Sequence, residues 1–345
     1  MVIRTSREPE PLDVIWNGRR IGAFALPDIL TALQACAGPE ASARSFAIHS
    51  LLGHDPEEVL QILGVLGLRD GVFWLHDFAS LCAGFHLMRN DVVDCGAPPP
   101  RSAACDVCIY GPSRERHLTG HARLFAGLNL TVAAPSSATL DLWRAATDLP
   151  AVRTLVLPHA TLVPRGPAKL PPRNRPFKIA FAGLAVPHKG WPIFRALAAR
   201  FANDPRYAFV HLGVQRDTAT PVDFETVAAG ADQPDAMRVA LERAQVDAVL
   251  VWPLCRETFS FVAYEAVAAG CAVITSPDTG NVAAFVGEGD HGLVMADEAA
   301  LMAAFTTGEI LQLSRTVRRP MLYDLAYSAL TLDLPPGDDG AQSGS

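Results

Sequence analysis

Short runs of apolar and β-branched residues alternate along the chain with longer mixed stretches, each long enough for a helix. Such runs are typical of buried parallel strands joined by crossover helices. The predicted strands of the first half are 46–49, 72–76, 107–110, 130–133 and 154–157. Those of the second half are 178–182, 208–212, 248–252, 272–275 and 293–295. The pattern therefore predicts two open parallel sheets.

The residues before the second predicted strand contain a helix start. Asp55 can cap a helix, Pro56 suits its first position, and an acid follows at Glu58. The apolar positions that come next have helical spacing. A helix is predicted to begin there.

The segment 163–176 is rich in proline and basic residues and has no periodicity, which is the composition of an interdomain linker. The predicted domains are an acceptor-side domain at 1–165, a donor-binding domain at 166–333 and a disordered tail at 334–345. Both domains have the pattern of Rossmann-like, doubly wound α/β folds. In such folds, ligands bind at the carboxyl ends of the strands.

The composition narrows the class of protein. Of 345 residues, 50% are hydrophobic and 19% are charged, with a formal net charge of −7, which favours a compact globular protein. No long basic run suggests a nucleic-acid partner. No stretch approaches the ~20 apolar residues of a membrane-spanning helix, and the first residues resemble no export signal. We expect a cytoplasmic protein without a transmembrane segment.

The most informative stretch, RETFSFVAYEAVAAG, covers residues 256–270 and directly follows a predicted strand. Gly270 suits a helix C-terminus, so the order is strand, loop and helix. The amides of Thr258, Phe259 and Ser260 would then lie at a helix N-terminus, where free N–H groups favour a diphosphate.

Two acids flank this predicted phosphate site. Glu257 can reach sugar hydroxyls, and Glu265, two turns later, can accept hydrogen bonds from a ribose diol. The alternative is a solvated helix with two ordinary surface glutamates.

The spacing of Glu257 and Glu265 resembles the E-x7-E signature of the family-four retaining glycosyltransferases, and the flanking residues resemble that family's donor loop. The resemblance implies the two-domain GT-B fold and a nucleoside diphosphate sugar as donor. It also implies that the first acid contacts the donor sugar and the second holds the ribose.

The loop at 181–190 resembles the family's first βα loop, with Gly183 at the turn and Lys189 matching the lysine that neutralises the diphosphate. Where the family has an arginine after the glycine, this chain has Leu184. Arg256 is a candidate replacement, and an ordinary surface role for Lys189 or Arg256 is the alternative.

His76 and Asp77 end a predicted strand of the first domain and match an HD pair of the family. The resemblance implies that His76 contacts the donor sugar or its transition state. Asp77 would orient His76 or cap the next helix. A purely structural histidine is the alternative.

Four cysteines follow within one short segment: Cys82, Cys95, Cys105 and Cys108. The last two form a C-x2-C pair, which suits a structural zinc site, and buried free thiols are the alternative. A similar insert follows the HD motif in a polysaccharide-associated subgroup of the family.

The resemblance as a whole implies a hexosyltransferase that acts on a glycan or lipid-linked glycan of the cell envelope, with retention and without a catalytic metal. A lipid-linked acceptor would bring it to the inner membrane as a peripheral protein. Residues 1–45 show no convincing version of the family's Gly-rich loop, so the first domain could be shortened. A nucleotide-sugar epimerase and a non-catalytic sugar-nucleotide-binding module therefore remain alternatives.

Overall fold

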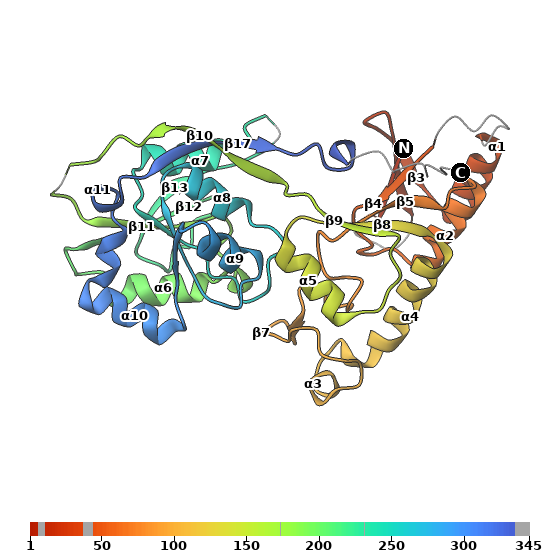
Figure 1. The fold of residues 1–345 in the computed structure, drawn as a ribbon, viewed down its shortest axis with the longest axis horizontal. Coiled ribbons are helices and arrows are strands. Elements are labelled where there is room, and N and C mark those ends of the chain that lie inside the picture. The colour runs from red at the N-terminus through yellow and green to blue at the C-terminus, as the bar shows by residue number, and fades with distance from the viewer. Residues whose placement is uncertain (6–10, 37–43, 173, 231, 335–345) are drawn as a thin grey trace, which may run out of the picture.

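The computed structural model describes residues 1–5, 11–36, 44–172, 174–230 and 232–334. Two domains lie side by side, each built on a parallel sheet (Figure 1). The tail predicted to be disordered falls, from residue 335 on, outside the described residues. Within the described ranges, no helix combines the length and the apolar character needed to cross a membrane.

The second domain contains a sheet of six parallel strands. Its order is β13 (Asp223–Thr226), β12 (Tyr207–Gly213), β11 (Phe177–Ala182), β14 (Ala248–Leu250), β15 (Ala272–Thr275) and β16 (Gly292–Val294). The strand order reverses between β11 and β14, which are hydrogen-bonded neighbours. This is the switch point at which doubly wound folds bind ligands.

Alternate residues of β11 build two separate cores, one on each face of the sheet. Ile179 and Phe181 pack on one face with α6 (Trp191–Arg200) and α10 (Glu298–Thr307). Ala180 packs on the other with α7 (Ala236–Arg243), α8 (Phe261–Ala268) and α9 (Asn281–Glu288). Each large side chain buried here contributes about 1.5–3 kcal/mol. The sheet is thus covered on both sides, which explains its nearly continuous apolar strands.

The first domain contains a four-stranded parallel sheet in the order β4 (Phe46–Ile48), β5 (Asp70–Trp74), β8 (Asn129–Ala134) and β9 (Arg153–Val156). The helices that pack against this sheet include α2 (Pro56–Val65), α4 (Gly111–Gly127) and α5 (Ser137–Ala146). The predicted helix start is confirmed: the Asp55 side chain caps α2 by accepting from the amide of Glu57 at 2.9 Å.

The chain begins with structure that the sequence pattern did not predict. β1 (Val2–Thr5), β2 (Leu12–Trp16) and β3 (Arg19–Phe24) form an antiparallel sheet, and α1 (Leu26–Cys36) follows. Leu12, Val14 and Ile29 bury their side chains against Ile62 of α2. These residues therefore attach the antiparallel sheet to the outer side of the first domain (Figure 1).

The strand predicted at 107–110 is wrong. The region holds a two-stranded hairpin, β6 (Met88–Arg89) with β7 (Val93–Asp94), and a short helix, α3 (Ala103–Asp106), followed by turns. Asn90 donates to Val107 O at 3.0 Å and accepts from the Ile109 amide at 2.8 Å. Because a side chain satisfies this backbone, the apolar run needs no sheet and stays exposed.

Two chain segments connect the domains. β10 (Ala160–Pro167) pairs antiparallel with β17 (Met321–Tyr327), and both contact α8. Gly166, near which the sequence suggests the domain boundary, therefore lies within a strand. After β17, the short helix η3 (Leu330–Asp333) returns to the first domain, where Trp74 Nε1 donates to Thr331 Oγ1 at 3.0 Å. The two segments are joined where the Ser328 amide donates to His159 O at 2.9 Å.

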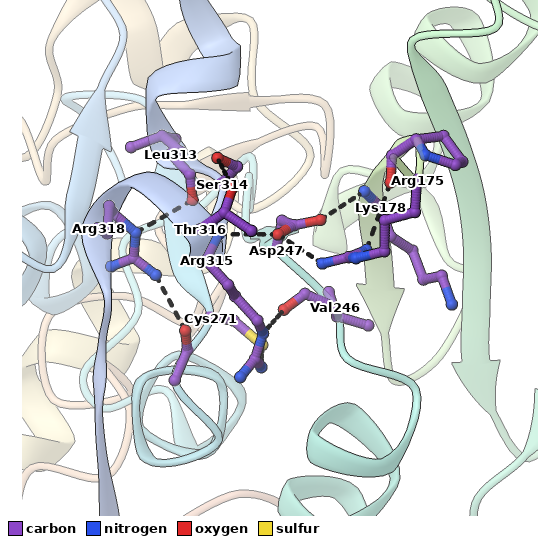
Figure 2. A network of polar contacts seen from close by, with 12 residues as sticks. Arg175, Lys178, Val246, Asp247, Cys271, Leu313, Ser314, Arg315, Thr316 and Arg318 are labelled. Carbon is purple, nitrogen blue, oxygen red and sulfur yellow. Dashed lines mark hydrogen bonds and ion pairs between the residues drawn. The ribbon is translucent and has the colours of Figure 1, made fainter. Parts of the chain in front are cut away.

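A buried carboxylate joins the amino-terminal end of the large sheet to the last α-helix of the described residues (Figure 2). Asp247 accepts from Arg175 Nη2 at 2.8 Å, from the Lys178 amide at 2.8 Å and from the Arg315 amide at 2.9 Å. Arg315 begins α11 (Arg315–Arg318). Asp247 thus fixes the start of β11, the segment before it and α11 at one point.

We expect Asp247→Ala to lower the free energy of unfolding by about 2–4 kcal/mol, because it leaves Arg175 unpaired and two amides without an acceptor. Denaturant titration measures the loss. Asp223→Ala, at an exposed position, is the matched control and should change stability by less than about 0.5 kcal/mol. Equal losses in the two variants would contradict the role assigned to Asp247.

Candidate active site

The candidate site lies at the carboxyl ends of β11 and β14, where the second domain meets the first. β11 is followed by Gly183, whose φ of +105° lies in the region that favours glycine. The short helix η1 (Pro187–Lys189) comes next, and Gly190, with φ +88°, is its C-cap. A Cβ on Gly190 would lie 2.1 Å from Trp252 O. Glycine at this position is what allows the loops after β11 and β14 to touch.

Two predicted site residues from these loops form an ion pair. Lys189 Nζ donates to Glu257 Oε1 at 2.6 Å. The Glu257 side chain is 15% exposed, and that of Lys189 is 43% exposed. The structure therefore brings together Lys189, the residue predicted to bind the diphosphate, and Glu257, the residue predicted to bind the donor sugar.

The backbone of Glu257 is held by the segment before α9. Its amide donates to Thr279 O at 3.2 Å, and its carbonyl accepts from the Asn281 amide at 2.9 Å. Gly280 has φ +64°, and a Cβ there would lie 2.8 Å from Glu257 O. This close approach fixes the direction in which the Glu257 side chain leaves the loop.

Helix α8 begins slightly later than the sequence suggests. Ser260 is its N-cap and accepts from the Ala263 amide at 3.4 Å, so the amides of Thr258, Phe259 and Ser260 precede the first turn. The first free amides of the helix belong to Phe261 and Val262.

Glu265 lies in α8 with 7% of its surface exposed. Its carboxylate has no hydrogen bond or ion pair with any other side chain that the structure describes. Burial, helped by the charge of Asp235 and opposed by that of Arg238, raises its pKa to about 7. A buried acid without a protein donor is suited to receive hydroxyl donors from a ligand.

Arg256 is engaged by the first domain. Its Nη2 lies 3.1 Å from Asp94 Oδ2, and its Nε donates to the same carboxylate at 3.2 Å. Asp278 Oδ1 lies 3.9 Å away. Arg256, which was predicted to bind the diphosphate, thus forms an ion pair between the two domains.

His76 lies two residues after β5, in a row of three imidazoles. His49 Nδ1 and His76 Nε2 are 2.9 Å apart, and His76 Nδ1 and His159 Nε2 are 3.0 Å apart. Thr331 Oγ1 lies 3.4 Å from His49 Nε2 and accepts from Trp74. Because the indole of Trp74 only donates, the chain of hydrogen bonds is consistent from Trp74 to His159 when each imidazole carries its proton on Nδ1.

The far end of this row has no hydrogen-bond partner in the part of the chain that the structure describes. His159 Nδ1 is buried without a hydrogen bond among the described residues, and its ring lies 5.1 Å from that of Phe259. Burial lowers the pKa of both His76 and His159 to about 4, with a smaller contribution from neighbouring histidines. The imidazoles are therefore neutral at pH 7. They interact through hydrogen bonds and carry no charge.

Asp77 and Thr258 connect the two domains at this point. Asp77 accepts from Ser50 Oγ at 3.1 Å and from the Ala79 amide at 2.8 Å, so it binds its own domain and does not orient His76. Burial raises its pKa. Thr258 Oγ1 donates to His76 O at 2.8 Å. Ser136 Oγ in turn donates to Thr258 O at 2.9 Å.

Several residues near the site were not predicted. His49 and His159 complete the imidazole row, and the rings of His86 and His188 stack across the domains at 5.5 Å. His49 follows β4 directly, and β4 pairs with β5. A polar residue just after a parallel strand is therefore the signal that would have identified it.

The four cysteines of the predicted zinc site line one cavity of about 20 Å³. Burial raises the pKa of Cys82 and Cys95. Cys105 accepts from Arg114 Nη1 at 2.9 Å, and although burial raises its pKa, hydrogen bonds from Ser102 and Arg114 outweigh that effect and lower it. Among the described residues, no group of three or more histidine, cysteine, aspartate or glutamate side chains has the arrangement needed to hold a metal ion.

Residues 178–307 match the family described as "Glycosyl transferases group 1". Among curated protein sequences there is no match. The fold is similar to HepE of Anabaena, solved with UDP-glucose: TM-score 0.54, 14% identity, 86% of this chain and 75% of that one. It is also similar to WaaG, a glycosyltransferase of lipopolysaccharide biosynthesis: TM-score 0.50, 13% identity, 85% and 90% of the two chains. The architecture is the GT-B fold, as the family resemblance implied.

The neutral imidazole row makes stability depend on pH. The pKa of His159 is lower in the folded chain than its ordinary 6.5, so the unfolded chain binds more protons between pH 6.5 and 4. The contribution of His159 to the free energy of unfolding is therefore fully present above pH 6.5 and is lost as the pH drops towards 4.

We expect His159→Asn to reduce this loss between pH 7.5 and pH 5 by about 1 kcal/mol, because asparagine does not titrate. Denaturant titrations of both proteins at the two pH values test this. Identical losses would show that His159 is not held neutral by the fold.

Proposed function

We propose that the protein transfers a hexose from a nucleoside diphosphate sugar to a hydroxyl of a growing surface glycan, with retention of configuration. One observation carries the proposal. Glu257 and Glu265 flank the start of α8 at the switch point of the large sheet, one paired with Lys189 and the other buried without a donor from the described residues. The match of residues 178–307 and the UDP-glucose complex of HepE support a sugar nucleotide as the ligand.

The nucleotide would bind with its ribose on Glu265, whose carboxylate would accept from both hydroxyls of the diol. The diphosphate would lie against Lys189, the loop at Gly183 and the amides from Thr258 to the first turn of α8. Arg256 would reach it only by leaving Asp94. Glu257, freed from Lys189 by the arriving phosphates, would accept from hydroxyls of the donor sugar.

In the transfer step, the bond between the anomeric carbon and the diphosphate oxygen breaks. A bond to the acceptor oxygen forms on the same face, and the acceptor proton passes to the departing diphosphate. Lys189 stabilises the charge that grows on the leaving group. His76, neutral within its row, would position the sugar through a hydrogen bond. No side chain is needed as general base.

Two other functions use the same donor site. An epimerase would convert the nucleotide sugar without an acceptor, and analysis of the products distinguishes it. A non-catalytic binding module would bind the donor without hydrolysing it, which a hydrolysis assay without acceptor would detect. The engagement of Arg256 by Asp94 is the observation that favours the binding module.

We expect a panel of nucleoside diphosphate sugars, UDP-glucose first, to raise the Tm of the wild-type protein, and Glu265→Gln to abolish that shift. The same substitution should stabilise the ligand-free protein at pH 8 by about 1–3 kcal/mol, because it removes a buried charge. The raised pKa of Glu265 means that the folded chain keeps its proton until about pH 7. The gain should therefore vanish as the pH falls to 4.5.

The matched control is Glu298→Gln, at an exposed position of α10. It should leave both the ligand shift and the stability at pH 8 unchanged. A ligand shift that survives Glu265→Gln would contradict the assigned ribose site. Absence of a shift with every donor in wild type would overturn the proposed function.

We also propose that Cys82, Cys95, Cys105 and Cys108 hold a structural zinc ion. The support is that all four line one cavity beside Arg114, a buried arginine whose partners are Leu81 O and Cys105 Sγ. Its charge would offset part of the negative charge of four thiolates. The ion would stabilise the fold and take no part in transfer.

Purified protein should contain about one zinc per chain by metal analysis, and Cys105→Ser with Cys108→Ser should remove it. Chelation should lower the Tm of wild type. The control is Cys36→Ser, an exposed cysteine of the same domain, which should keep its zinc. Zinc-free wild-type protein with an unchanged Tm after zinc addition would favour buried free thiols.

A further inference from the structure

A basic groove of about 500 Å³ lies on the second domain, away from the candidate active site. It is lined by the end of β10, one side of α7 and the start of α11. Arg315 in its wall donates to Val246 O and Ala269 O, which lie two residues before β14 and three residues before β15. The groove therefore lies towards the amino ends of the strands, whereas Lys189 and Glu257 lie at their carboxyl ends.

The lining of the groove is strongly cationic. It contains one acid, Glu242, and five basic residues, which are Arg165, Lys169, Arg238, Arg243 and Arg315. Glu242 is shared, because Arg165 Nη2 lies 2.5 Å and Arg238 Nη1 lies 3.6 Å from the same oxygen. The other acids paired with these arginines, Asp235, Asp324 and Glu225, are not among the lining residues. The interior thus keeps a net positive charge.

Arg315 is the second observation that indicates an anion. It is 2% exposed, and its guanidinium donates from Nε to Val246 O at 2.6 Å, as Figure 2 shows. Its Nη2 donates to Ala269 O, also at 2.6 Å. In the part of the chain that the structure describes, no carboxylate lies within 4.0 Å of that guanidinium, and Nη1 has no hydrogen-bond partner. A buried cation without a counter-ion is costly unless a ligand supplies one.

We propose that this groove binds a phosphate-bearing anion at a site separate from the donor site. Arginine presents a planar fork of donors that matches phosphate oxygens, and a volume of this size suits a small ligand. Lys169, at the rim, adds a flexible charge without a partner among the described residues. The ligand is either a soluble phosphorylated molecule or the headgroup of an anionic lipid, and both offer the same chemistry.

Isothermal titration calorimetry with inorganic pyrophosphate tests the site. The test variant is Lys169→Gln with Arg243→Gln, which removes two exposed cations from the rim and leaves buried Arg315 in place. We expect its affinity for pyrophosphate to fall at least tenfold. The charge-matched control is Arg19→Gln with Arg123→Gln on the first domain, which should bind as wild type does.

A second control separates this site from the donor site. Lys189→Gln should leave binding in the groove unchanged, although it removes the cation proposed for the donor diphosphate. The proposal is overturned if wild type binds no pyrophosphate, or if binding survives in the groove variant and is lost in Lys189→Gln.

Sedimentation with phosphatidylcholine vesicles containing phosphatidic acid separates the two sources of phosphate. Vesicle binding that is lost in the groove variant and kept in the Arg19 and Arg123 control identifies a lipid headgroup. Pyrophosphate binding without vesicle binding identifies a soluble ligand.

Discussion

The loop between β14 and α8 is hydrogen-bonded to both domains, and the arrangement of the whole candidate site depends on it. Thr258 binds His76 and Ser136 of the first domain through its hydroxyl and its carbonyl. One residue earlier, Glu257 is held by Asn281 on one side and by Lys189 on the other. A few residues thus set both the position of the domains and the position of the acid.

The polar groups of the site are costly to the fold. Among the described residues, Glu265 is a buried acid without a donor, and the buried Nδ1 of His159 has no hydrogen-bond partner. Neither contributes to folding in this state, because each group has lost water and gained no partner. Stability of the domains comes instead from the two apolar faces of the large sheet and from Asp247 at its opposite edge. The carboxyl ends of the strands therefore carry the candidate site, and the amino ends contribute to stability.

The sequence allowed most of the second domain to be predicted, because its strands, its Gly183 turn and the Glu257 loop are encoded by short, local patterns. The meeting of Lys189 and Glu257 follows from the strand order that such a fold adopts. The ion pair of Arg256 and Asp94 could not be predicted, because it joins residues from separate domains. The antiparallel sheet at the start was missed because its apolar residues pack on helix α2 and not on another sheet.

The paired crossing of the chain between the domains limits how they can move. A single flexible connection would let one domain swivel about many axes relative to the other. Here two antiparallel segments cross together, and the Ser328 amide holds them by donating to His159 O. Such a pair resists twisting and leaves bending across the ribbon as the easiest motion. His159 lies in this paired crossing and also ends the imidazole row. Bending of the crossing would therefore change the geometry around His76 directly.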